Sequence, residues 1–118
     1  MSHSFINYKG KRILYIDYTK CKTTADMINV LEEAKRLYES TTEMYLVIND
    51  FTGATGSTEY MQKVKQYGKE IFDGRTTKSA ILGISGIKKI LLNGYNSIAG
   101  KRVVPFDTKE EAVEYLVE

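Results

Sequence analysis

The stretch from Met44 to Ser57 constrains the fold more than any other part of the 118-residue chain. An apolar run from Met44 to Ile48 stops at Asn49-Asp50, and a loop of small and hydroxyl residues then leads into an amphipathic segment. Such a run, apolar without alternation, predicts a central strand that is covered on both faces. In α/β folds, ligands and partners bind where the loops leave the carboxyl ends of such strands. The sequence therefore predicts an α/β domain with a polar site directly after this strand.

The flanking segments complete the expected order β-β-α-β-α-β-α-β-α in a single domain, residues 1–118. Two β-rich segments, 3–8 and 12–18, are separated by a short glycine-centred connection, which predicts an antiparallel hairpin. Strands separated by single helices predict parallel pairs joined by right-handed crossovers. We therefore expect a mixed five-stranded sheet with four helices. The other expected strands are 44–48, 78–84 and 102–106, and the expected helices begin at Thr23 or Thr24, at Ser57 or Thr58, after Ser85-Gly86, and at Thr108.

Local sequence signals predict further details of these helices and strands. Gly74 is expected to end the second helix in a left-handed conformation. Pro105 lacks an amide donor, which places the last strand at a sheet edge. The buried stripe of the first helix is predicted from helical spacing to contain Met27, Leu31, Ala34 and Tyr38, and Val30 and Leu37 are expected to widen it.

Composition excludes several classes of protein. No apolar run is long enough to span a bilayer, no secretory signal is visible at the N-terminus, and Cys21 is the only cysteine, which suits the cytoplasm. The net charge of +2 does not call for a polyanionic partner. Basic residues do prevail over residues 61–102, either as solvated helix faces or as a surface for an anionic ligand. Nucleic acid is an unlikely partner, and its candidate contacts are Lys63, Lys65, Lys69, Arg75 and Lys78.

The loop after the central strand carries the first group of candidate binding residues, which are Asp50, Thr52, Thr55, Ser57 and Thr58. Hydroxyls and free amides at a helix start can hold an anion or a partner, and Ser57 can accept a phosphate. The alternative is structural: Asp50 and Thr52 satisfy turn amides, and Ser57 caps the helix.

Ser85, Gly86 and Lys88 form the second candidate group, at the turn after the fourth strand. Gly86 lets backbone amides approach a ligand and Lys88 adds charge. The spacing is that of neither a phosphate-binding P-loop nor a hydrolase nucleophile elbow, and the structural alternative is a tight strand-to-helix turn.

The sequence offers few residues from which a catalytic site could be built. With His3 and Cys21 as the only histidine and cysteine, neither a His/Cys zinc site nor a Ser-His-Asp triad is supported. We expect no catalytic residue, no metal site and no cofactor. Tyrosines are abundant, and they either line a half-apolar pocket or interface or pack in the core. This group contains Tyr15, Tyr18, Tyr45, Tyr60, Tyr67 and Tyr95.

Four stretches together carry a resemblance to a known group: residues 8–17, the Asp50-Phe-Thr-Gly53 turn with the strand before it, the Gly86-Ile-Lys-Lys89 helix start, and residues 106–116. They resemble the SpoIIAA-like proteins, small relatives of the STAS domain. The resemblance implies a mixed sheet, regulation through partner proteins, and kinship with the CRAL–TRIO lipid-binding fold. Phosphorylated STAS regulators carry a serine where this chain has Ser57, but their Asp-Ser-Ser-Gly motif is absent.

Together these observations favour a cytoplasmic, non-enzymatic regulatory domain that contacts a partner protein at the loop edge of its sheet. Homodimerisation is a further expectation. The alternative is a carrier or sensor that holds a lipid-like or other small ligand between sheet and helices.

Overall fold

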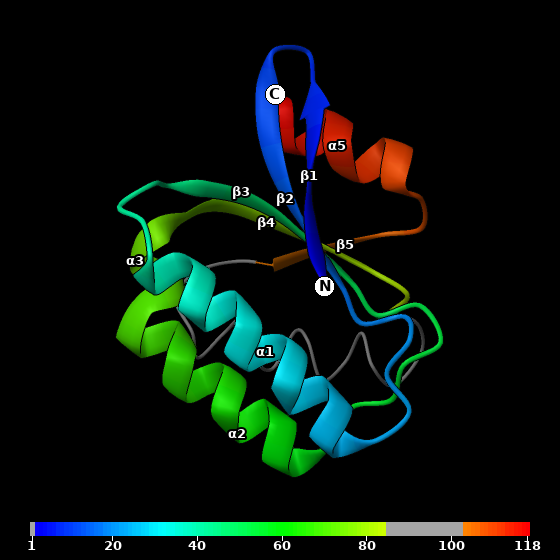
Figure 1. The fold of residues 1–118 in the computed structure, drawn as a ribbon. Helices are drawn as coiled ribbons and strands as arrows, with labels where there is room; N and C mark the ends of the chain where they lie inside the picture. The colour runs from blue at the N-terminus through cyan, green and yellow to red at the C-terminus, as the bar shows by residue number, and fades with distance from the viewer. Residues whose placement is uncertain (1, 85–102) are drawn as a thin grey trace.

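The computed structural model describes residues 2–84 and 103–118, which form an α/β domain around a mixed five-stranded sheet (Figure 1). The strand order is β1-β2-β3-β4-β5; β1 pairs antiparallel with β2, and all other pairs are parallel. The predicted hairpin and parallel core are therefore confirmed. The strands are β1 (His3–Tyr8), β2 (Lys11–Asp17), β3 (Tyr45–Asp50), β4 (Thr76–Leu82) and β5 (Val103–Phe106).

Helices lie on both faces of the sheet (Figure 1). Helices α1 (Thr24–Glu39) and α2 (Thr58–Tyr67) run side by side over one face, and α5 (Lys109–Val117) covers the other. Helix α2 continues through a π-helical turn, Gly68–Phe72, into the short α3 (Asp73–Arg75). The helix expected after Ser85-Gly86 falls outside the described residues.

The β1–β2 hairpin turns through two residues that both have positive φ, Lys9 at 50° and Gly10 at 78°. This is the dihedral requirement of a type I′ turn, whose twist matches that of the flanking strands. Beyond the turn, β2 alternates as the sequence predicts: Leu14 and Ile16 contribute to one core cluster and Ile13 to the other. Both β2 and the central β3 are thus buried on both faces.

The larger core, between the sheet and helices α1 and α2, is rich in aromatic side chains. Tyr18 stacks on Phe51 with ring centroids 4.3 Å apart, and Tyr60 meets both rings edge-on. The predicted α1 stripe is confirmed for its four residues and for Val30, which are all buried, whereas Leu37 is only partly buried. Core packing is also the role of four tyrosines for which a pocket was the alternative, namely Tyr18, Tyr45, Tyr60 and Tyr67, whereas Tyr95 lies outside the described residues.

The smaller core lies under α5. Ile13, Ile48, Ala80 and Leu82 project from β2, β3 and β4 toward Ala112, Val113 and Leu116 of the helix. Thr108 caps α5, since its hydroxyl accepts the Glu111 amide at 3.2 Å. This agrees with the predicted helix start.

The prediction that Gly74 caps the second helix is wrong. Gly74 lies inside α3, does not have a positive φ, and is followed by a helical Arg75. The chain leaves the helix through Thr76, which is extended (φ −113°, ψ 119°), so no left-handed residue is needed. Arg75 instead donates to the Tyr38 carbonyl at 3.1 Å and the Glu43 carbonyl at 2.7 Å, satisfying acceptors at and beyond the end of α1.

Strand β4 is shifted by two residues from the predicted 78–84, because Gly83 leaves the extended conformation with φ of 82°. Pro105 does lie in an outer strand of the described sheet, where β5 pairs only with β4. Among the helices of the described residues, none has the length and apolar character required to cross a membrane.

Candidate functional site

The turn that follows β3, residues 50–58, contains the first predicted site group, and Asp50 organises it. The Asp50 side chain is buried, and its Oδ1 accepts the Thr52 amide at 3.0 Å and the Thr52 hydroxyl at 2.6 Å. This is the local arrangement by which an aspartate stabilises a turn. Its Oδ2 accepts the hydroxyl of Tyr15, which reaches across from β2.

Burial alone would raise the pKa of Asp50. The hydrogen bonds donated by Thr52 and Tyr15, together with the nearby Lys109 ammonium, outweigh that effect and lower its pKa. Burial and the bond to Asp50 raise the pKa of Tyr15, so its hydroxyl stays protonated as a donor. Lys109 Nζ lies 4.4 Å from the centroid of the Tyr15 ring, which places a positive charge beside this pair.

A second turn of the same kind stands beside the first. The sequence Asp17-Tyr18-Thr19 ends β2 as Asp50-Phe51-Thr52 ends β3, and Asp17 pairs with Asp50 in the parallel register. Asp17 Oδ1 accepts the Thr19 amide at 2.8 Å and the Thr19 hydroxyl at 2.6 Å. The two aspartates thus stabilise equivalent turns at neighbouring strand ends.

Gly83 fixes the β3 turn against the end of β4. A Cβ atom at Gly83 would lie 2.3 Å from the Thr52 nitrogen and 2.7 Å from the Phe51 carbonyl carbon. Only glycine permits so close a backbone contact, and its positive φ also favours glycine. The Phe51 amide donates to the Leu82 carbonyl at 2.9 Å. The ends of β3 and β4 therefore meet at one edge of the sheet, as the sequence predicted for these two strands.

The candidate residues of the β3 turn divide into two kinds. Asp50 is buried, and the Ser57 hydroxyl accepts the Tyr60 amide at 3.2 Å as the α2 cap, so both have the structural role given above as the alternative. Thr52, Thr55 and Thr58 are exposed. The second group, Ser85, Gly86 and Lys88, lies outside the described residues.

Sequence reasoning missed Tyr15 and Lys109 as partners of Asp50. Strand alternation puts Tyr15 on the face that Asp50 also uses, but this becomes informative only once the β2–β3 register is known. The repeated Asp-aromatic-Thr pattern was a usable signal, since it marks two equivalent strand ends. No local pattern connects Lys109 with this site, because it arrives from a helix at the far end of the chain.

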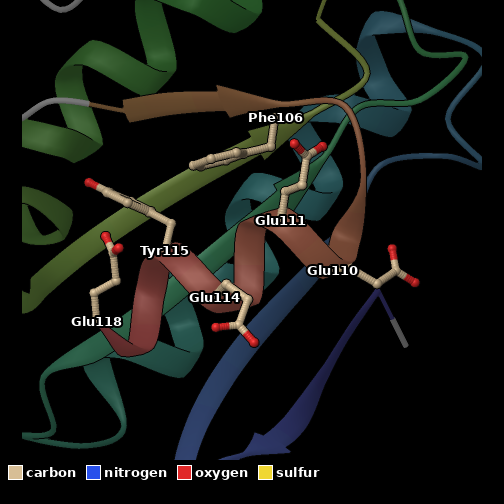
Figure 2. Close-up of a pocket in the computed structure, with 6 residues that line it drawn as sticks. All are labelled: Phe106, Glu110, Glu111, Glu114, Tyr115 and Glu118. Atoms are coloured by element: carbon tan, nitrogen blue, oxygen red, sulfur yellow. The ribbon is translucent and has the colours of Figure 1, made fainter.

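A hollow of about 470 Å³ lies beside α5 and is lined by residues of this helix and by Phe106 of β5 (Figure 2). The rings of Phe106 and Tyr115 lie beside each other in its lining, with centroids 5.2 Å apart. Four glutamates complete its lining, namely Glu110, Glu111, Glu114 and Glu118. Their charge makes this hollow unsuitable for the anionic ligand considered for the basic part of the chain.

The five candidate nucleic-acid contacts do not act as one group. Lys78 donates to the Tyr115 and Glu118 carbonyls on the α5 side of the sheet, at 3.1 and 3.3 Å. Arg75 is held at the end of α1 on the opposite side. Two of the five basic side chains are therefore engaged in hydrogen bonds within the protein.

The described residues contain no group of three or more acidic, histidine or cysteine side chains arranged to hold a metal ion. The single histidine, His3, lies in β1 with Nδ1 3.5 Å from Glu33 of α1. Neither a family model, nor a curated protein, nor a solved structure matches this chain. The fold class thus stands on its own geometry, and the STAS resemblance stays a prediction.

Proposed function

We propose that this chain is a STAS-like, non-enzymatic regulatory domain that binds a partner protein through the β3 turn, residues 50–58. The observation that carries the proposal is that the backbone of this exposed polar turn is held in place from two sides. Gly83 contacts the Phe51–Thr52 peptide from one side, and Asp50 holds Thr52 from the other. A loop fixed on a rigid scaffold binds with little loss of conformational entropy.

The chemistry of the turn supports binding over catalysis. Both carboxylate oxygens of Asp50 accept hydrogen bonds, and its lowered pKa makes it a weak base at neutral pH. Ser57 Oγ accepts an amide, and no base is bonded to it among the described residues. The exposed residues Thr55 and Thr58 carry hydroxyls suited to hydrogen bonding with a protein surface, whereas the Thr52 hydroxyl donates to Asp50.

A photo-crosslinking residue at position 55 would capture the partner, whose affinity for the purified wild-type protein is then measured. We expect Thr55→Arg to weaken that affinity at least roughly tenfold, because a large side chain at the centre of an interface disrupts packing. Thr42→Arg is the matched control, since Thr42 is exposed in the loop before β3, at the opposite end of the strand. Equal affinities for wild type and Thr55→Arg would refute the proposal.

The alternative of a small-ligand carrier stays a prediction. The described space between the sheet and helices α1 and α2 is occupied by the stacked rings of Tyr18, Phe51 and Tyr60. A persistent extra mass on the purified protein in native mass spectrometry would favour the carrier over the partner-binding domain. Cytoplasmic localisation also stays a prediction.

Phosphorylation of Ser57 is a further prediction tied to this turn. Its phosphate would lie at the N-terminus of α2, where the helix dipole favours negative charge, although Glu59 in the first turn opposes it. Intact-mass analysis of protein purified from its native source, compared with a Ser57→Ala variant, tests this directly.

A further inference from the structure

The outer edge of β1 presents a row of backbone groups that no other described strand pairs with. The Asp17 amide donates to the Ser2 carbonyl at 2.8 Å, and Tyr8 pairs with Lys11 across the two-residue turn. In the alternating antiparallel pattern, residues 4, 6 and 8 therefore direct their backbone groups toward β2, as the Ser2 carbonyl does. The amides and carbonyls of His3, Phe5 and Asn7 point the other way, away from the sheet.

This edge lacks the features by which proteins protect outer strands. Natural edges are guarded by proline, inward-pointing charges or bulges. Strand β1 has the sequence HSFINY, with no proline, lysine or acidic residue, and its register with β2 is regular over all six residues. By contrast, β5 at the other side of the described sheet contains Pro105.

Phe5 marks the centre of the same edge. Phe5 and Met44 are the two large hydrophobic side chains that are exposed in the described part of the chain. The Phe5 ring has Tyr45 at a centroid distance of 6.4 Å and the Arg12 guanidinium at 3.9 Å, so it is held in place yet still 38% exposed. An apolar ring fixed at an open strand edge indicates an interaction surface.

We propose that β1 is the interface of a homodimer, in which two copies of β1 pair antiparallel about a two-fold axis through Phe5. With the axis perpendicular to the sheet, paired residues must share a face, and the free groups at positions 3, 5 and 7 must meet each other. The strand register that meets both conditions and is centred on the exposed Phe5 ring places Phe5 opposite Phe5 of the second copy. His3 then lies opposite Asn7 of the second copy. All three of these residue pairs are then hydrogen-bonded pairs. The described five-stranded sheets of the two copies become one continuous sheet.

Charge complementarity favours a second copy as the occupant. Glu33 lies at the His3 end of β1, and Arg12, whose guanidinium is 3.2 Å from Glu43 of its own chain and half exposed, lies beside Asn7 at the other end. Since His3 faces Asn7 across the axis, each Glu33 comes near Arg12 of the second copy, on the same face of the sheet. An isologous contact of this kind closes at two subunits, because each β1 edge is then occupied by the β1 of the other copy.

The size of the interface sets its strength. A six-residue strand with one central aromatic pair buries less than the roughly 1,600 Å² of a standard interface. We therefore expect a reversible dimer with a Kd of roughly 10–100 μM, at the weak end of specific association.

Sedimentation velocity over a concentration series tests the dimer in the full-length chain. Phe5→Lys places two like charges opposite each other on the axis and is expected to raise the Kd at least roughly tenfold. Met44→Lys is the matched control, because it makes the same change at the other exposed hydrophobic residue, which precedes β3 and is not part of β1, and should leave the Kd unchanged. Circular dichroism establishes that each variant is folded.

Cross-linking tests the register without relying on a destabilising change. In a Cys21→Ser background, Phe5→Cys places two thiols on residues whose Cα atoms are about 5.5 Å apart, within disulfide reach. Asn7→Cys is the control, since Asn7 faces His3 rather than itself. We expect oxidised dimers from the Phe5→Cys variant only.

Three outcomes would overturn the proposal: a protein that is monomeric throughout the series, a dimer unaffected by Phe5→Lys, or equal cross-linking of the two cysteine variants. A monomer that binds an extended peptide from another protein at β1 would overturn the choice of occupant. The inference is independent of the proposed function, because Thr55→Arg should leave the dimer intact and Phe5→Lys should leave the β3 turn intact.

Discussion

Replacing Gly83 with alanine tests the contact that fixes the β3 turn. The added Cβ would lie 2.3 Å from the Thr52 nitrogen and 2.5 Å from the Thr52 Cα, which are backbone atoms and cannot rotate away. Forcing the turn outward costs about 1–3 kcal/mol, as for other overpacked sites. A non-glycine residue at a φ of 82° costs about 1–2 kcal/mol more. We therefore expect Gly83→Ala to lower the free energy of unfolding by about 2–5 kcal/mol.

Substitutions at two other glycines separate the steric and the conformational contributions to this loss of stability. Gly53 has nearly the same φ, 77°, but an added Cβ would meet nothing within 4 Å, so Gly53→Ala should cost only the conformational part, about 1–2 kcal/mol. Gly74 is helical and open, so Gly74→Ala should stabilise the protein by about 0.5–1 kcal/mol.

Urea unfolding monitored by circular dichroism measures all three variants, with the denaturant slope checked for constancy. The reasoning requires Gly83→Ala to exceed Gly53→Ala by more than the scatter of ordinary surface changes, about 0.5 kcal/mol. Equal losses for these two variants would show that Gly83 does not press on the Phe51–Thr52 peptide. The rigid mounting on which the proposed function depends would then be lost.

Further predictions concern the same turn and its surroundings. Asp50→Asn should cost about 2 kcal/mol at neutral pH, because it removes charge-assisted hydrogen bonds from a buried group. Since the folded pKa of Asp50 is lowered, its contribution is present above the ordinary aspartate pKa and lost as the pH falls through the folded value, so urea titrations should show the wild-type advantage shrinking in acid. Ser57→Ala should cost about 1 kcal/mol as a lost helix cap, whereas Thr55→Ala at an exposed position should stay within about 0.5 kcal/mol in the same assay. A larger loss at Thr55 than at Ser57 would contradict these assignments.

Much of the architecture followed from sequence because its signals are local. The apolar run before Asp50, the hairpin at Lys9-Gly10 and the helix caps at Thr23 and Thr108 each depend on a few adjacent residues, and all are confirmed. The sheet order followed as well, because each strand pairs with the next one along the chain.

The parts that failed or were missed depend on distant residues. Gly74 was expected to end a helix in a left-handed conformation, but the chain enters β4 through the extended Thr76. Arg75 donates a hydrogen bond to a carbonyl at the end of a different helix, α1. The close approach of Gly83 to the β3 turn requires the position of a neighbouring strand. Lys109 joins Asp50 and Tyr15 across most of the chain. Such contacts are set by tertiary packing, which no window of the sequence encodes.

The placement of α5 has a consequence for synthesis of the chain. Because the strands follow one another in space as they do in sequence, the sheet can grow from its N-terminal hairpin while translation continues. Among the described elements, only α5 covers the face that carries Ile13, Ile48 and Leu82, and it is the last to leave the ribosome. Until then, no other described element covers that face. We therefore expect a nascent chain that pauses before residue 109 to bind chaperones more than the finished domain does.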